Sequence, residues 1–339
     1  MESPDVDTLI RDTEAEILRV LGDGDGDPPT RGLYDMIRYH LGLDGSGAPA
    51  GKRMRPLLGL LAYMSIAGEH ARALPGAAAV ELGHNFSLVH DDIEDGDLER
   101  RHRPTIWALH GIPQAINTGD AIFAISRIAL HRLTDLGFSD AKVLRLMRLY
   151  DRTCLTLCEG QYIDIATSEG DELVSVELYL DMIGRKTAAL VSASVEAGAL
   201  LATDDEETIE RYRRLGWALG LAFQLNDDLL GIWGESASTG KEPSDIAKHK
   251  KTLPVLYAFE HAEPADRARL AEIYARAEAS PADLPEAIAI LERAGARTYT
   301  REAARRYRDE ALAEMAAVPG VDPDAKAALE AIVVRVISA

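Results

Sequence analysis

The sequence has little of what disulfide-rich or membrane-spanning proteins are built from. Cysteine occurs only as Cys154 and Cys158 in 339 residues, and their i, i+4 spacing on a predicted helix suits neither a disulfide nor, with two thiols alone, a zinc site. We expect both to be packing residues in a reducing cytoplasm. The longest apolar run, 57–67, is too short to span a bilayer, and the N-terminus lacks the basic and apolar regions of a signal peptide. We therefore expect a cytoplasmic protein without stable membrane insertion.

Basic residues are also scarce relative to acidic ones. Lys and Arg number 37 against 56 Asp and Glu, which gives a formal net charge of −19. This balance argues against nucleic acid or an anionic membrane surface as the main partner. A small anionic substrate stays compatible with it, provided that cations are concentrated locally.

Alternating strand patterns are absent, and helical periodicity dominates. The chain is therefore predicted to be all-α, with one domain over 1–339 in which 1–30 form an acidic N-terminal helix and loop. The predicted helices cover 5–21, 31–42, 54–69, 74–92, 113–133, 139–168, 174–198, 204–233, 252–262, 265–277, 282–294, 297–316 and 323–337.

The first of two aspartate clusters, Asp91-Asp92-Ile93-Glu94-Asp95, falls at the C-terminal end of the predicted helix 74–92. A helix dipole disfavours negative charge at that end, so the cluster needs compensation. Asp91 and Asp95 are spaced i, i+4 and lie on one helix face. A lone acidic run is commonly a solvated surface patch.

The second cluster, Asp227-Asp228, lies within the apolar stretch 219–233, where a carboxylate pair needs a compensating partner. Gln224 and Asp228 are also spaced i, i+4, so their oxygens could converge on one ion. Magnesium fits best, because it prefers oxygen ligands and commonly takes the others from water and substrate phosphates. Two clusters, with the second in an apolar frame, favour a metal site over a surface patch.

Cations accompany both clusters. Taken singly, each basic group could be a solvated face or a helix cap, but together they suit a reaction between two diphosphates of which one is metal-bound. The groups are Gly51-Lys52-Arg53-Met54-Arg55-Pro56, Arg100-Arg101-His102-Arg103, Lys186-Thr187, Lys241 and Lys250.

With these motifs the chain resembles the trans-isoprenyl diphosphate synthases, or polyprenyl synthetases, and within them geranylgeranyl diphosphate synthases. The resemblance runs from about Gly51 to Pro254. It is carried, in order, by Gly51 to Pro56; His84 to Asp95 with Arg100-Arg101; Gly160-Gln161 with Asp164; Lys186-Thr187; Phe223-Gln224 with Asp227-Asp228; and Gly240-Lys241, Asp245 and Lys250.

The resemblance implies a single-domain antiparallel helical bundle around a central cavity, the isoprenoid synthase type I fold, and a homodimer. It implies condensation of isopentenyl diphosphate with dimethylallyl, geranyl or farnesyl diphosphate, with up to three Mg²⁺ ions held by Asp91, Asp95 and Asp227. The implied catalytic residues are Asp91, Asp92, Asp95, Arg100, Lys186, Asp227 and Lys241. The implied substrate-binding residues are Lys52, Arg55, His84, Arg100, Arg101, Lys186, Thr187, Gln224, Lys241 and Lys250, and Gln161, Asp164, Asp228 and Asp245 are implied as supporting polar wall.

Product length is expected to depend on the residues that precede the first cluster. Phe86 lies roughly 7 to 8 Å below Asp91 along the helix, and the small Ser87 lies one turn below Asp91. This combination resembles enzymes that stop at geranylgeranyl diphosphate, the C20 product.

Two departures from the family pattern keep alternatives open. Gly231 stands where many relatives have a third Asp, and His102 where many have Gly. Gly231 also leaves a spacing similar to the second metal motif of class I terpene cyclases. Such a cyclase, which acts on a single prenyl diphosphate, and a non-catalytic subunit of a heteromeric prenyl synthase are therefore the competing hypotheses.

Overall fold

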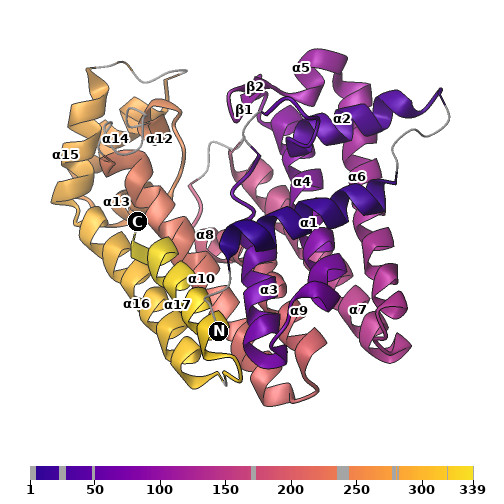
Figure 1. The fold of residues 1–339 in the computed structure, drawn as a ribbon. Helices are drawn as coiled ribbons and strands as arrows, with labels where there is room; N and C mark the ends of the chain where they lie inside the picture. The colour runs from indigo at the N-terminus through magenta and orange to yellow at the C-terminus, as the bar shows by residue number, and fades with distance from the viewer. Residues whose placement is uncertain are drawn as a thin grey trace. The chain divides into compact units, whose positions relative to one another are not determined.

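The computed structural model describes residues 5–22, 28–47, 50–168, 173–234, 244–276, 280, 282–318 and 320–338, and their regular secondary structure is helical apart from one short hairpin. The all-α prediction is confirmed (Figure 1). By their internal contacts the residues divide into two compact units, which are described separately below. The expectation of one domain over 1–339 stays a prediction.

The first unit comprises Met1–Cys154, Ala193–Arg213 and Val318–Ile332. Its elements are α1 (Val6–Leu21), α2 (Arg31–Leu41), α3 (Met54–Ala67), η1 (Ala71–Ala73), α4 (Leu74–Glu94), β1 (Glu99–Arg100), β2 (Arg103–Pro104), α5 (Ile106–His110), α6 (Ile112–Asp135) and the first part of α7 (Asp140–Ser168). Parts of α9 (Ala189–Ala202), α10 (Glu206–Trp233) and α17 (Pro323–Ser338) complete it.

Helix α4, which carries the first aspartate cluster, is the central helix of this unit and packs against α1, α3 and α6 (Figure 1). Its first half is rich in small side chains, and Ala78, Ala79 and Leu82 are fully buried. Small residues let neighbouring helices approach closely, while Pro75 in the first turn suits a helix start. The cluster is therefore mounted on a helix that packing fixes on several sides.

The second unit comprises Leu155–Ser192, Arg214–Ala317 and Val333–Ala339. Besides its shares of α7, α9, α10 and α17, it contains α8 (Val176–Ile183), η2 (Gly184–Ala188), α12 (Ser244–Ala247), α13 (Leu253–His261), α14 (Pro264–Tyr274), α15 (Asp283–Arg293) and α16 (Ala296–Ala317). One apolar cluster joins α8 to α10, α13 and α16, and a second joins α13 to α14 and α15.

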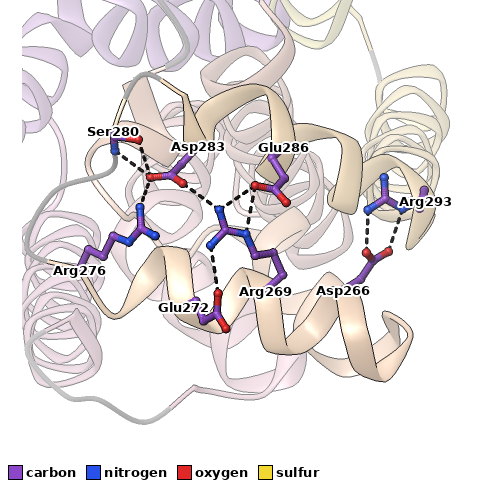
Figure 2. A network of polar contacts seen from close by, with 8 residues as sticks. All are labelled: Asp266, Arg269, Glu272, Arg276, Ser280, Asp283, Glu286 and Arg293. Atoms are coloured by element: carbon purple, nitrogen blue, oxygen red, sulfur yellow. Dashed lines mark hydrogen bonds and ion pairs between the residues drawn. The ribbon is translucent and has the colours of Figure 1, made fainter.

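A polar network ties α14 to α15 in the second unit (Figure 2). Arg269 donates to Glu272, Glu286 and Asp283, Arg276 also donates to Asp283, and a separate pair joins Arg293 to Asp266. Surface ion pairs contribute little singly, but several that share one carboxylate form a network. None of these residues belongs to the predicted site, so the network is structural.

Several local features differ from the expectation. The hairpin of β1 and β2 and helix α5 were not predicted, and the expected helix 174–198 is divided by the π-helical turn η2. Cys154 is buried as expected, but Cys158 is exposed, so its prediction as a packing residue is wrong. No helix among the described residues combines the length and apolarity needed to cross a membrane.

Candidate active site

The aspartates at the acidic end of α4 differ in how far they are buried. Asp92 is 2% exposed and accepts a 2.6 Å hydrogen bond from Nε of Arg100, whereas Asp91 is half-buried and Asp95 is exposed at the helix end. Burial raises the pKa of Asp92, and the charge of Arg100 opposes that rise. Asp92 therefore positions Arg100, while Asp91 and Asp95 are accessible to a ligand.

Arg100 retains donors after this contact. A guanidinium group has five N–H donors, and the bond to Asp92 uses the one on Nε. Arg100 can therefore be held by Asp92 and still donate its terminal N–H groups to an anion.

The hairpin that follows contains a left-handed turn. Glu99 pairs with Pro104 and Arg100 with Arg103, and the two turn residues, Arg101 and His102, have φ of 54° and 61°. Two consecutive positive φ values are typical of a type I′ turn, which favours glycine and asparagine. His102 is therefore held in a backbone region that is less favourable for a residue with a β-carbon.

The turn places Arg101 against the start of the basic motif at residues 51–56. A β-carbon at Gly51 would lie 2.8 Å from Nη2 of Arg101, so glycine allows the guanidinium to lie on the backbone here. Nη1 of Arg55 lies 3.0 Å from Nε2 of His84. The four predicted substrate-binding residues, Lys52, Arg55, His84 and Arg101, all belong to the first unit. The structure pairs Arg55 with His84 and places Arg101 against Gly51, the residue before Lys52.

The electrostatics of this cluster favour an anion. Burial and then the charge of Arg55 lower the pKa of His84 far below its usual value, so the ring is neutral and its Nε2 accepts from Arg55. Burial together with the charges of Arg101 and Arg100 lowers the pKa of His40 to about 3. Within the described ranges no ion pair joins Arg55 or Arg101 to a carboxylate, and the buried Nε of Arg55 has no hydrogen-bond partner. The charge of Glu81, which pairs directly with Arg53, acts on both arginines from a greater distance. Arginines that make no direct ion pair keep N–H donors that suit a diphosphate.

Arg53, a member of the basic motif with no predicted role, is a buried residue that connects three helices. Its side chain is 1% exposed; Nη1 lies 2.7 Å from Glu81, Nε 3.1 Å from Glu14, and Nη2 donates to the carbonyl of Leu41 at 2.6 Å. These partners come from α4, α1 and the end of α2. Arg53 thus fixes the backbone between Lys52 and Arg55, at a φ of 49°. No local sequence signal separates it from the neighbouring cations.

In the second unit, the two aspartates of the second cluster also differ in burial. Asp227 is exposed, whereas Asp228 is 2% exposed and accepts from the Tyr179 hydroxyl at 2.7 Å, from Nε2 of Gln224 at 3.2 Å and from the Leu253 N–H at 3.4 Å. Burial raises the pKa of Asp228 to about 7. Asp228 is therefore a structural acceptor.

The idea that Gln224 and Asp228 converge on one ion is wrong. Their side chains bond to each other, and Oε1 of Gln224 accepts from the Thr187 hydroxyl at 3.0 Å. Both side chains are directed into the protein by this chain of hydrogen bonds. Asp227 is the accessible carboxylate of the pair.

The π-helical turn η2 carries Lys186 and Thr187. Nζ of Lys186 lies 2.5 Å from Asp164 on α7, and a β-carbon at Gly160 would lie 2.5 Å from the backbone nitrogen of Lys186. Gly160 therefore lets α7 approach the turn, and Asp164 orients the ammonium group. Single π-helical turns occur frequently at functional sites.

The space beside Gly231 is filled by a side chain from another element. A β-carbon at Gly231 would overlap the carboxylate of Asp245, which is 8% exposed and lies 3.3 Å from Nζ of Lys250. The Asp245 carboxylate, from α12, thus occupies the space beside α10 that a side chain at position 231 would need. Lys241, predicted to bind substrate, lies outside the described residues.

The residues of both units fit magnesium by their chemistry. Asp91, Asp95 and Asp227 are oxygen donors that keep some exposure. In the described part of the chain, no three His, Cys, Asp or Glu side chains are grouped as a complete metal site. Magnesium does not require one, because it commonly binds through one or two carboxylates plus water and substrate phosphates.

The comparison with known families decides the class. The family model "Polyprenyl synthetase" matches residues 36–291. The chain belongs to this family. It is a trans-prenyl diphosphate synthase, a prenyltransferase of isoprenoid biosynthesis.

Individual relatives agree with this assignment. A geranylgeranyl diphosphate synthase of Mycobacterium tuberculosis is 41% identical over 294 residues, which cover 85% of this chain and 81% of the relative. A (2E,6E)-farnesyl diphosphate synthase of the same species is 39% identical over 305 residues, which cover 87% and 83%. The two relatives make different products, so similarity alone leaves the chain length open.

Solved structures share the fold. A geranylgeranyl pyrophosphate synthetase from Pyrococcus horikoshii matches with a TM-score of 0.89 and 32% identity over 98% of this chain and 97% of the other. A geranylgeranyl pyrophosphate synthase from Corynebacterium glutamicum, complexed with isoprenyl diphosphate and magnesium, matches with a TM-score of 0.83 and 25% identity over 98% and 99%. The predicted fold class is therefore confirmed.

Proposed function

We propose that this polyprenyl synthetase condenses isopentenyl diphosphate with an allylic diphosphate and releases geranylgeranyl diphosphate. The observation that carries the proposal lies within the first unit. This unit has an accessible acidic helix end at Asp91 and Asp95, and separately a cationic cluster around Arg55 and Arg101 that makes no direct ion pair with a carboxylate among the described residues. One set of groups suits a metal-bound diphosphate and the other a metal-free one, whereas a terpene cyclase needs only the first.

Roles follow from this division. Asp91, Asp95 and Asp227 would hold up to three magnesium ions for the allylic diphosphate, and the magnesium and isoprenyl diphosphate in the Corynebacterium structure support this choice of metal. When bound, magnesium stabilises the negative charge that develops on the departing diphosphate. Arg100, Lys186 and Lys241 donate to the same group, and this electrostatic stabilisation is the largest catalytic contribution.

Isopentenyl diphosphate is bound by the cationic cluster of Lys52, Arg55, His84 and Arg101. After the allylic C–O bond ionises, the alkene of isopentenyl diphosphate attacks the allylic cation and forms the new C–C bond, and the proton then lost passes to the departed diphosphate. Catalysis at this step is by positioning. Thr187, Gln224 and Lys250 support the polar wall, and apolar side chains keep water from the carbocation.

The C20 product is supported by the position of Phe86. It is 7% exposed on α4, below Asp91, while the Ser87 hydroxyl donates to the His84 carbonyl at 2.9 Å and stays on its own helix. Phe86 thus presents the first buried phenyl ring below the acidic end, whereas the His90 ring above it is partly exposed. We expect Phe86→Ala to lengthen the product and Ser87→Ala to leave it unchanged.

The test uses the purified single chain with Mg²⁺, isopentenyl diphosphate and each of the C5, C10 and C15 primers, with products identified by mass spectrometry. We expect geranylgeranyl diphosphate from all three. Geranylgeranyl diphosphate supplied alone should be recovered unchanged, whereas conversion to a hydrocarbon or alcohol would establish a cyclase. Absence of any condensation by the purified chain would point to a non-catalytic subunit.

A homodimer is supported by apolar side chains exposed around the turn between α5 and α6. Leu109, Ile112 and Ile116 are 48%, 48% and 46% exposed. Grouped exposed apolar residues are typical of protein interfaces. Ile116→Arg should lower the mass measured by light scattering from dimer to monomer, whereas Val321→Arg, at a position 74% exposed outside this group, should not. A monomeric wild-type chain would refute the homodimer.

A further inference from the structure

The interface between α4 and α6 is built in layers below the acidic end of α4. In the upper layer, the His90 ring lies on Gly119, where a β-carbon would overlap it. In the next, the rings of Phe86 and Phe123 lie 5.0 Å apart between centroids, tilted by 59°. From one layer to the next, residue numbers decrease along α4 and increase along α6, so the two helices are antiparallel. Each layer is about one helical turn from the next.

A third layer lies below Phe86 and is supplied by α7. Tyr150 is 5% exposed and its hydroxyl lies directly on Gly83, where a β-carbon would overlap it. The hydroxyl donates to Oγ of Ser126 at 2.6 Å, and Ser126 in turn donates to the carbonyl of Phe123 at 2.5 Å. A buried tyrosine whose hydroxyl is bonded in this way has a fixed ring position.

The order of these layers along α4 follows from helix geometry. At 1.5 Å per residue, Phe86 lies roughly 7.5 Å and Gly83 roughly 12 Å below Asp91. Side chains on a helix lean toward its N-terminus, so the Phe86 ring covers the turn that includes Gly83. Tyr150 is therefore the next large side chain that a growing chain would reach if the Phe86 ring were absent.

We propose that Tyr150, seated on Gly83 and held by Ser126, is a second chain-length stop beneath Phe86. The proposal rests on the proposed synthase activity with Phe86 as the first stop. The hydrocarbon tail of the product, an apolar polyprenyl chain, ends at the Phe86 and Phe123 layer in the wild type. Removal of the Phe86 ring opens one layer, and the tail then ends at Tyr150.

This arrangement predicts a strict order of effects in product mass spectra. Phe86→Ala should give products one or two isoprene units longer than the wild type and then stop. Tyr150→Leu alone should leave product length unchanged, because Phe86 stops the chain above it. The double variant should exceed the length reached by Phe86→Ala, with at least a tenfold larger fraction of the longer products.

The matched control is Tyr150→Phe in the Phe86→Ala background, which keeps the ring and should reproduce the products of Phe86→Ala. Longer products from Tyr150→Leu alone, or equal lengths from the double variant and Phe86→Ala, would overturn the proposal. Unchanged products from Phe86→Ala would overturn it as well. No condensation by the wild type would instead refute the proposed function.

One measurement avoids any change at Tyr150. The Phe86→Ala enzyme is supplied with its own principal product as primer, together with isopentenyl diphosphate. We expect elongation at less than one tenth of the rate seen with the wild-type product as primer. Elongation at an equal rate would show that nothing beneath Phe86 stops the chain, and it would exclude Tyr150.

Discussion

Replacing Arg53 by methionine tests whether the buried connector of the basic motif stabilises the fold and orients the isopentenyl diphosphate site. The change keeps much of the side-chain volume but leaves Glu81, which is 3% exposed, without the guanidinium 2.7 Å away. Removing one partner of a buried ion pair costs about 3–5 kcal/mol, because a charge is left uncompensated. The remaining bond from Asn85 to Glu81, at 2.9 Å, reduces the loss, so we expect about 3 kcal/mol.

The free energy of unfolding is measured by urea denaturation followed by circular dichroism. Arg11→Met is the matched control, since Arg11 and Asp5 form a 3.4 Å pair with side chains 65% and 61% exposed. Such an exposed pair contributes little, because water screens its charges, so Arg11→Met should leave the free energy of unfolding nearly unchanged. The double variant Arg53→Met with Glu81→Met should recover part of the stability, because it removes both buried charges.

Steady-state kinetics test whether Arg53 orients the isopentenyl diphosphate site, independently of its effect on stability. Lys52 and Arg55 flank Arg53, so Arg53→Met should raise the KM for isopentenyl diphosphate more than the KM for the allylic substrate. A loss below about 1 kcal/mol would refute the structural role. Equal changes in both KM values would refute the orienting role.

Three further predictions concern particular residues. His102→Gly should raise the free energy of unfolding by about 0.5–1 kcal/mol, measured by urea denaturation, because glycine tolerates the φ of 61°; a loss would contradict the strained turn. Gly231→Asp should lower activity and the melting temperature because its β-carbon would overlap Asp245; a gain in activity would show that the site accommodates the aspartate. The pKa of Asp228 is raised from 3.8 to about 7, so its contribution to stability is present below pH 4 and is lost as the pH rises through 7. Asp228→Asn should flatten this dependence in pH-resolved melting curves, and an unchanged slope would argue against the shift.

The sequence alone located most of the helices and the chemistry. Helical periodicity is a local property, and all thirteen predicted ranges correspond to helical segments whose ends differ by a few residues. The two aspartate clusters and the basic motif at 51–56 could likewise be found from residue types and spacing. The hairpin after α4 could not be predicted, because Arg101 and His102 are poor candidates for a left-handed turn on local grounds.

The tertiary structure decided which member of each motif reaches solvent. Sequence shows Asp91 beside Asp92 and Asp227 beside Asp228, but only packing determines that the second of each pair is buried and hydrogen-bonded. Burial is set by the face of a helix that contacts other segments, and those segments are far away in the chain. Residue types and their spacing, together with the family resemblance that they carry, therefore determined the reaction class, whereas the division of each motif into ligands and supports depended on contacts that exist only in the folded protein.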